Sequence, residues 1–256
     1  MNALNDITIL KIGGSIITDK DADDGAPNNS EIKRIAGEIS KHHGKLIVVH
    51  GAGSFGHPQA KKYALNKKFD AKGALITHIS VKALNHIVVE SLANAGIDAI
   101  GVHPMGSTVS GDGRIAQMFI ENIHLMLDNG FIPVLHGDVV MDTKLGTSIL
   151  SGDQIVTYLA MQLGSARIGI GSAKDGVLDD KGDTIAAITS SNFKDIKQYI
   201  GGSESTDVTG GMLGKVVELV RLCEMSNINS RIFNAGTSGN VSRFLDGANI
   251  GTVITK

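Results

Sequence analysis

Short apolar runs alternate along the chain with stretches in which apolar residues recur at helical spacing. Most runs are rich in Ile, Val and Leu and end at a glycine or a polar residue, as buried strands do. They predict strands at residues 7–12, 46–49, 97–102, 131–135, 167–170, 231–233 and 252–254. Residues 139–149 have the pattern of a hairpin.

The intervening segments follow a period of 3.6 residues. Ile32, Ile35, Ala36 and Ile39 form one apolar face of a helix that Asn29 or Ser30 can cap. Further helices are predicted at 75–95, 115–129, 154–163, 213–225 and 241–245, with Gly96 and Gly130 as C-terminal stops. In 115–129 the residues expected to face inward are Phe119, Ile123, Met126 and Leu127.

This alternation of strand and helix predicts the α/β class. We expect a mostly parallel central sheet sandwiched between helical layers, in a single domain that spans 1–256. Ligands of such sheets bind outside the carboxyl ends of the strands. The loops that follow strands are therefore the places to look for chemistry.

Composition and net charge indicate a globular protein and argue against some classes of partner. Apolar residues make up 42% and charged residues 20% of the 256 residues, as in globular proteins with a core. A net charge of −2 without a basic stripe argues against nucleic acid as a partner. Cys223 is the only cysteine, so we expect a small apolar residue on a helix face. The N-terminus does not resemble a signal peptide, and no run reaches the ~18 apolar residues of a membrane span, so a cytoplasmic location is expected.

Two predicted strands lead directly into glycine-rich loops. The first is followed by Gly13, Gly14 and Ser15 after Lys11, with Lys20 nearby in a polar loop. The second is followed by HGAGSFGH, from His50 to His57. Consecutive backbone N–H groups without side chains can form an anion-binding concavity. Each loop alone is also compatible with a tight structural turn bearing solvated side chains.

Two later segments open helices. In Ser151-Gly152-Asp153-Gln154, either Ser151 or Asp153 can cap the helix, and Asp153 can instead orient lysines or help to hold a metal. In the run from Asp207 to Lys215, glycines precede a lysine on the first helical turn, which suits a polyphosphate. No Walker A sequence, serine-protease order or paired-Cys metal spacing is present. The loops together favour phosphoryl transfer, which depends on positioning and charge neutralisation. His42, His43, His103 and His136 are expected to be structural or solvated.

The motifs and their order resemble the amino acid kinase superfamily. These are Lys11-Ile12-Gly13-Gly14-Ser15, HGAGSFGH, Gly152-Asp153 and DVTGGMLGK. HGAGSFGH, PVLHGDVVMD at 133–142 and SGDQIV are similar to the isopentenyl phosphate kinases, and the resemblance spans about residues 9–254. It implies ATP-dependent phosphorylation of isopentenyl phosphate to the diphosphate, with Mg²⁺ as cofactor, in a cytoplasmic homodimer. It also implies an acceptor side at about 1–165 and a nucleotide side at about 166–256.

The resemblance also implies roles for the matching residues. Lys11, Lys20 and Lys215 would neutralise charge on the transferred group, Asp153 would orient the lysines, and His57 would donate to the acceptor's phosphate. The implied nucleotide-binding residues are Lys11, Gly13, Gly14, Ser15, Gly53, Asp175, Gly176, Gly210, Gly211 and Lys215. The implied acceptor-binding residues are Gly51, Ala52, His57 and Gly152, with Gly53 beside them. No side chain is implied as a metal ligand.

One segment departs from the family pattern. The family usually has a TDVDG-like run at the nucleotide site, where this chain has Ser172-Ala173-Lys174-Asp175-Gly176. Two alternatives therefore stay open. One is a related kinase that acts on another small phosphate, phosphonate or carboxylate acceptor. The other is a nucleotide-binding protein without catalysis. The acceptor's tail pocket is expected to include the helix near 75–88.

Overall fold

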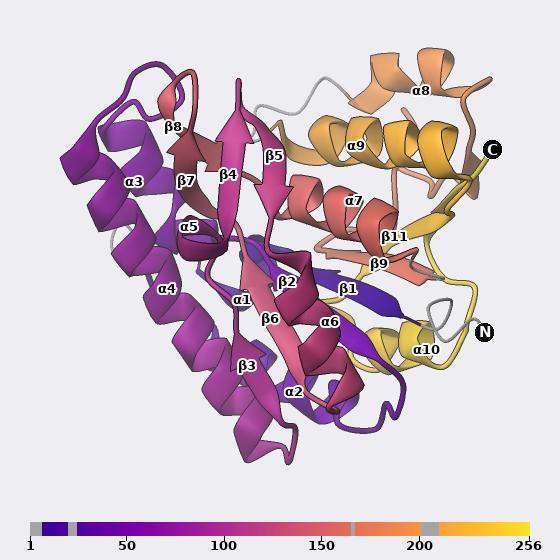
Figure 1. The fold of residues 1–256 in the computed structure, drawn as a ribbon. Coiled ribbons are helices and arrows are strands. Elements are labelled where there is room, and N and C mark those ends of the chain that lie inside the picture. The colour runs from indigo at the N-terminus through magenta and orange to yellow at the C-terminus, as the bar shows by residue number, and fades with distance from the viewer. Residues whose placement is uncertain (1–6, 20–24, 165–166, 201–209) are drawn as a thin grey trace.

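The computed structural model describes residues 7–19, 25–164, 167–200 and 210–256. Within them, eight strands form a central sheet in the order β10-β12-β11-β9-β1-β2-β6-β3 (Figure 1). The strands are β1 (Thr8–Ile12), β2 (Leu46–His50), β3 (Ala99–Gly101), β6 (Ile132–His136), β9 (Arg167–Ser172), β10 (Ala187–Ile188), β11 (Ser230–Asn234) and β12 (Thr252–Ile254). Every neighbouring pair is parallel except β11 with β12. The predicted α/β class and mostly parallel sheet are confirmed.

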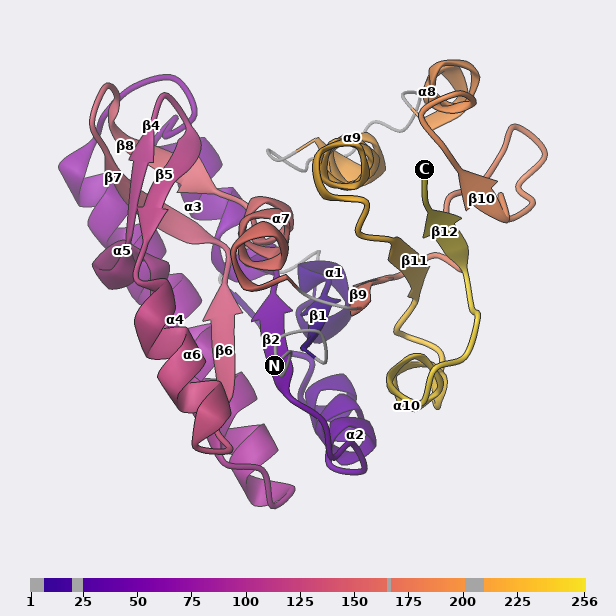
Figure 2. The same ribbon diagram turned by 45° about the vertical axis from the view of Figure 1, so that its right-hand side comes forward.

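Alternate residues of each strand face opposite sides of the sheet and enter two separate cores. Ile9, Ile47 and Val49 pack with residues of the helices α6 (Ile120–Asp128), α7 (Gly152–Leu163), α8 (Phe193–Ile200) and α9 (Gly211–Ser226). Leu10 and Val48 pack with residues of α2 (Asn29–Ile39), α4 (Ala71–Asn94) and α10 (Asn240–Leu245). Figure 2 shows α7 and α9 on one side of the strands and α2 and α10 on the other. A strand buried on both faces favours apolar residues at most positions, which explains the short apolar runs in the sequence.

Side-chain caps explain where two of the helices begin. The bounds of the helices are α1 Gly14–Ile17, α2 Asn29–Ile39, α3 His57–Lys62, α4 Ala71–Asn94, α5 Pro104–Ser107, α6 Ile120–Asp128, α7 Gly152–Leu163, α8 Phe193–Ile200, α9 Gly211–Ser226 and α10 Asn240–Leu245, with a 3₁₀ turn, η1, at Gly53–Phe55. The predicted cap of α2 is wrong by one residue, because Asn28 Oδ1 accepts from Glu31 N at 3.3 Å. Helix α4 begins four residues earlier than predicted, since Asp70 caps it through Gly73 N at 2.7 Å.

A second sheet stands beside the carboxyl edge of the first, next to α3 and α4 (Figure 1). Its strands are β4 (Thr108–Gly111), β5 (Arg114–Met118), β7 (Asp138–Asp142) and β8 (Gly146–Leu150), in the order β5-β4-β7-β8. The predicted hairpin at 139–149 is confirmed as β7 and β8, which pair antiparallel. Asp142 links the β4–β5 turn to the β7–β8 turn. Its carboxylate accepts hydrogen bonds from the N–H groups of Asp112, Gly113, Lys144 and Leu145.

The helix predicted at 115–129 is wrong over its first part. Residues 114–118 form β5, and α6 begins only at Ile120. Phe119 is exposed rather than inward, while Ile123 and Leu127 are buried and Met126 packs against the core. The turn between β4 and β5 is Asp112-Gly113, and both residues have positive φ, at 58° and 76°. Such a turn joins two antiparallel strands and is incompatible with a helix.

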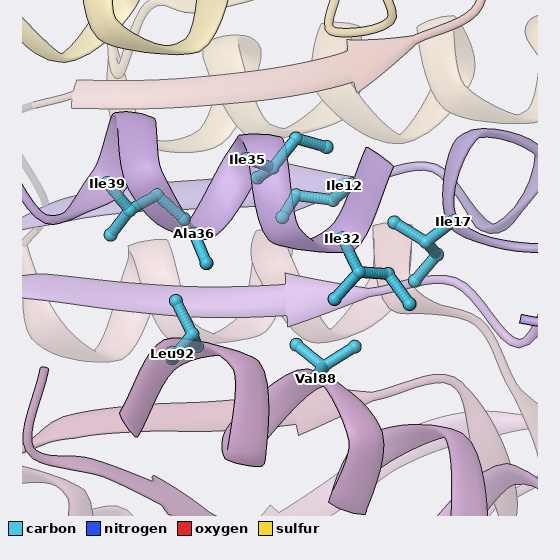
Figure 3. Close-up of a pocket in the computed structure, with 8 residues that line it drawn as sticks. All are labelled: Ile12, Ile17, Ile32, Ile35, Ala36, Ile39, Val88 and Leu92. Atoms are coloured by element: carbon cyan, nitrogen blue, oxygen red, sulfur yellow. The ribbon is translucent and has the colours of Figure 1, made fainter. Parts of the chain in front are cut away.

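One small internal gap lies in the core between α2 and α4. Figure 3 shows apolar side chains of both helices facing one another across it; the lining residues are Ile12, Ile17, Ile32, Ile35, Ala36, Ile39, Val88 and Leu92. Its volume is about 10 Å³. A gap of that size with no polar partner stays empty even of water, so it binds no ligand. Among the described residues, no helix is both long enough and apolar enough to cross a membrane.

Candidate active site

The register of the parallel strands brings the predicted loops to one edge. Ile12 of β1 lies opposite His50 of β2 and Gly171 of β9. His50 in turn lies opposite His136 of β6, and Ser172 lies opposite Asn234 of β11. The turns that follow β1, β2, β6, β9 and β11 therefore start side by side at the carboxyl edge of the sheet.

The first two glycine turns touch through their backbones. A Cβ added to Gly14 would lie 2.4 Å from Gly53 N, and one added to Gly51 would lie 2.5 Å from Gly14 N. Thr18 links the same turns, since its hydroxyl donates to Gly14 O at 2.8 Å and accepts from Ser54 N at 3.1 Å. These glycines are thus required by close backbone approach, independently of any ligand.

Asp153 joins two lysines at this edge. Its Oδ1 lies 2.5 Å from Lys11 Nζ, and its Oδ2 lies 3.9 Å from Lys215 Nζ. Asp153 and Lys11 are each only 4% exposed. The cap of α7 is Ser151, whose Oγ accepts from Gln154 N at 3.2 Å, so the side chain of Asp153 serves the lysines instead. A Cβ on Gly152 would approach Lys11 Cε to 3.0 Å, which explains a glycine beside the carboxylate.

Lys215 reaches the site from α9, of which it is the fifth residue. Its Nζ donates to Gly211 O at 3.2 Å. Gly210, the residue before the helix, has φ 91°, and Gly211 has φ 57°, so both lie in the left-handed region that favours glycine. The N–H groups of a helix's first turn have no intrahelical acceptor and carry partial positive charge. An anion bound between Lys11 and Lys215 would also be attracted by the partial positive charge at the start of α9.

The cleft beside these residues has a volume of about 440 Å³. It is lined by Asp153 and Gln154 of α7 and their cap Ser151, by Gly214 of α9 and the preceding Gly210, and by Thr147, Ser148 and Ile149 of β8. Across it Arg114 of β5 pairs with Glu218 of α9, at 2.5 Å and 3.0 Å. Nothing in the periodicity of the sequence indicates this pair.

The remaining residues implied by the resemblance occupy the same edge. His57 is the first residue of α3, separated from η1 by Gly56, and is half-buried. Gly13 follows β1 and its N–H donates to Gly171 O at 2.8 Å, and Ser15 is exposed. Asp175 follows β9 and accepts from Asn234 Nδ2 at 3.0 Å, and Ala173 and Lys174 beside it are exposed. Lys20 lies outside the described residues.

The fold brings together a group of histidines near the carboxyl ends of β2 and β6 that sequence reasoning did not connect, although it expected His103 and His136 to be structural or solvated. His50 and His136 are fully buried, and their rings stack with centroids 5.6 Å apart. His103 Nδ1 lies 3.0 Å from His136 Nε2, and His78 Nδ1 lies 2.9 Å from Asp138 Oδ2. Burial lowers the pKa of His50 to about 4 and of His136 to about 3, while the bond to Asp138 raises the pKa of His78. The available signal was the repeated dipeptide His-Gly at the ends of two strands.

Comparisons with known family models, sequences and structures all point to the same family. The model of the amino acid kinase family matches residues 6–234. The isopentenyl phosphate kinase of Methanothermobacter thermautotrophicus is 37% identical over 96% of this chain and 98% of its own. That of Haloferax volcanii is 38% identical over 97% and 98%. A solved isopentenyl phosphate kinase superposes with a TM-score of 0.85 at 33% identity, covering 97% of this chain and 100% of the other.

The lysines and Asp153 meet at the edge where the family resemblance predicts phosphate chemistry, and the relatives match nearly the whole chain. The chain therefore belongs to the amino acid kinase family and, within it, to the isopentenyl phosphate kinases.

Proposed function

We propose that the chain transfers the γ-phosphoryl group of ATP to isopentenyl phosphate and yields isopentenyl diphosphate. The observation that carries the proposal is the buried carboxylate of Asp153, which holds Lys11 and Lys215 beside the touching glycine turns. The relatives named as isopentenyl phosphate kinases support this choice of acceptor. Transfer between two phosphates needs aligned oxygens and neutralised charge, and these residues supply both.

The two lysines have the central electrostatic role in this proposal. Negative charge is spread over the equatorial oxygens of the group in flight. Cations fixed in a site that excludes water stabilise such charge more than they would in bulk solvent. Asp153 keeps the lysines in place between turnovers, when no phosphate balances their charge. We assign Lys20 the same role as the two lysines on the resemblance alone.

The acceptor's phosphate is assigned to the turn after β2 and to the start of α7, at Gly51, Ala52 and Gly152. His57 is assigned a donor's role. The attacking oxygen belongs to a phosphate that is already ionised near neutral pH, so no base is required. A donor, by contrast, holds that oxygen in line with the γ-phosphoryl group.

The nucleotide is assigned to the other half of the edge. Gly13, Gly14, Ser15 and Gly53 would contact its terminal phosphates, and Gly210 and Gly211 would add the N-terminus of α9. Asp175 and Gly176 would lie along the nucleoside. Apart from these four residues near the N-terminal strands, we propose residues up to about 165 as the acceptor side and those from about 166 as the nucleotide side.

We also propose Mg²⁺ as cofactor, a homodimeric assembly and a cytoplasmic location. These three parts of the proposal are based on the family resemblance. Asp153 fits poorly as a magnesium ligand, because Lys11 already balances its charge at 2.5 Å. Mg²⁺ would enter with ATP and be held mainly by phosphate oxygens and water, as is usual for this ion in kinases. When bound it would neutralise the charge of the β- and γ-phosphates.

Release of ADP with three acceptors tests the proposal. The purified protein with ATP and Mg²⁺ is given isopentenyl phosphate, unphosphorylated isopentenol or N-acetylglutamate. Turnover with the first alone is the expected result. Turnover only with the carboxylate would identify a related kinase with another acceptor. ATP binding without turnover of any acceptor would identify a nucleotide-binding protein without catalysis.

A further inference from the structure

Two neighbouring strands end in the same dipeptide and make the same unusual bond. β2 ends in His50-Gly51 and β6 ends in His136-Gly137, and the two histidines lie opposite one another in the register. In both, ring Nδ1 lies 3.0 Å from the carbonyl oxygen of the glycine that follows. A carbonyl only accepts, so Nδ1 carries the proton in both rings.

The partners of the other ring nitrogen agree with this tautomer. His50 Nε2 faces the amide nitrogen of Asn85 at 3.1 Å, and that amide also donates to Val134 O at 3.2 Å. His136 Nε2 faces His103 Nδ1 at 3.0 Å. Each Nε2 must therefore accept, and burial holds both imidazoles neutral at physiological pH.

The two bonds fix the direction of two peptide groups. In a trans peptide the N–H points opposite to the C=O, so anchoring Gly51 O directs the N–H of Ala52 away from the ring. A Cβ built on Gly137 would lie 3.5 Å from Gly152 N, 3.5 Å from Leu150 O and 3.7 Å from Ala52 N. Two amide nitrogens and one carbonyl oxygen of the backbone thus border one spot beside Gly137. Gly152 N–H has no intrahelical acceptor, since it is in the first turn of α7.

We infer that His50 and His136 are positioning residues for the acceptor's phosphate. Each donates its Nδ1–H to the glycine carbonyl and so holds the peptides that shape the cradle between Ala52, Gly137 and Gly152. The inference rests on the proposed function and adds to it two residues that never touch the substrate. Glycine turns are otherwise the most mobile backbone, and a side-chain anchor removes that freedom before the ligand binds.

Two substitutions separate this role from plain packing. His136→Phe keeps a ring of similar shape but removes the donor, whereas His136→Asn keeps an N–H where Nδ1 was but removes the ring. A positioning role predicts that the Phe variant raises KM for isopentenyl phosphate roughly tenfold or more and leaves KM for ATP within about twofold. In the Asn variant, KM for isopentenyl phosphate should stay closer to the wild-type value. His50→Phe and His50→Asn follow the same order, and His86→Phe, on the exposed face of α4, serves as control.

The opposite order overturns the inference, because a packing role favours Phe over Asn. Equal changes in KM for ATP and for isopentenyl phosphate overturn it too. If the Asn variants fail to fold, ¹⁵N spectra of wild-type histidines at pH 7 decide. We expect Nδ1–H in both rings, and Nε2–H or a cation refutes the bonds. A wild-type protein that is inactive on isopentenyl phosphate refutes the proposed function itself, which is a separate outcome.

Discussion

Removal of the Asp153 carboxylate has a large expected effect on stability. Asp153→Leu keeps the branched shape at Cγ and leaves Lys11 buried without its counter-charge. Breaking a buried pair from one side costs about 3–5 kcal/mol. Lys11 bears most of that loss, because the attraction at 2.5 Å is about 1.6 times that at 3.9 Å and Lys215 is more exposed.

The double variant Asp153→Leu/Lys11→Met tests this cause. Both charges are then replaced by apolar groups of similar volume, an exchange that is often neutral for a buried pair. We expect the free energy of unfolding, from urea titration, to return close to wild type while ADP release stays undetectable. This separates the loss of stability from the loss of catalysis.

A matched control is available at the surface. Lys45 and Asp128 lie 2.7 Å apart, a similar separation, but their side chains are 34% and 60% exposed. Asp128→Leu should leave stability close to wild type, because exposed pairs contribute little. A double variant as unstable as Asp153→Leu would refute the reasoning, since the cost would then come from lost packing and not from a stranded charge.

Three further outcomes are expected. Lys215→Ala should lower kcat by on the order of 10²-fold with little change in KM for isopentenyl phosphate, and an unchanged kcat excludes Lys215 from the mechanism. His57→Gln should retain measurable kcat/KM and His57→Ala should lose far more, whereas equal losses contradict a donor's role. Between pH 6.5 and pH 4, His50 and His136 bind protons more readily in the unfolded chain than in the folded one, because burial lowers their pKa. As the pH falls through this range, the free energy of unfolding should therefore decrease by up to ~1.4 kcal/mol per pH unit for each histidine. Urea unfolding at pH 7 and pH 5 measures this, and a slope unaltered in His136→Phe contradicts it.

Seven of the eight strands of the central sheet were predictable because they are short, mostly apolar runs, as burial on both faces favours. The eighth, β10, was not predicted, since its two residues are too few to form a pattern. The face of α2 was predictable for a similar reason, as all four of its apolar residues are buried. The error at 115–118 has a physical origin. Ile115, Phe119 and Ile123 recur at intervals of four and imitate a helix, although Asp112-Gly113 is a strong hairpin turn. The turn should have outweighed the periodicity.

The candidate site was less accessible to sequence reasoning. Lys11, Asp153 and Lys215 are far apart in the chain, and only the resemblance to a family linked them before the fold was known. The histidine pair could not be identified from local pattern, because it depends on the register of β2 with β6. Its His-Gly repeat acquires meaning only when the two strands are neighbours.

The two lysines differ in a way that bears on the reaction cycle. Lys11 is buried and closely paired, so its position is set by β1 and Asp153 whether or not a phosphate is present. Lys215 is 3.9 Å from the same carboxylate, a separation at which the attraction is weaker and a short hydrogen bond is absent. An incoming phosphate therefore competes with a weaker attraction to Asp153 at Lys215 than at Lys11. Lys215 is the fifth residue of α9, and Glu218 of the same helix is held by Arg114 across the cleft, so we expect Lys215 to respond by motion of its own side chain. Under the proposed function, we therefore expect Lys11 to define where the transferred group lies and Lys215 to supply the charge that responds to it.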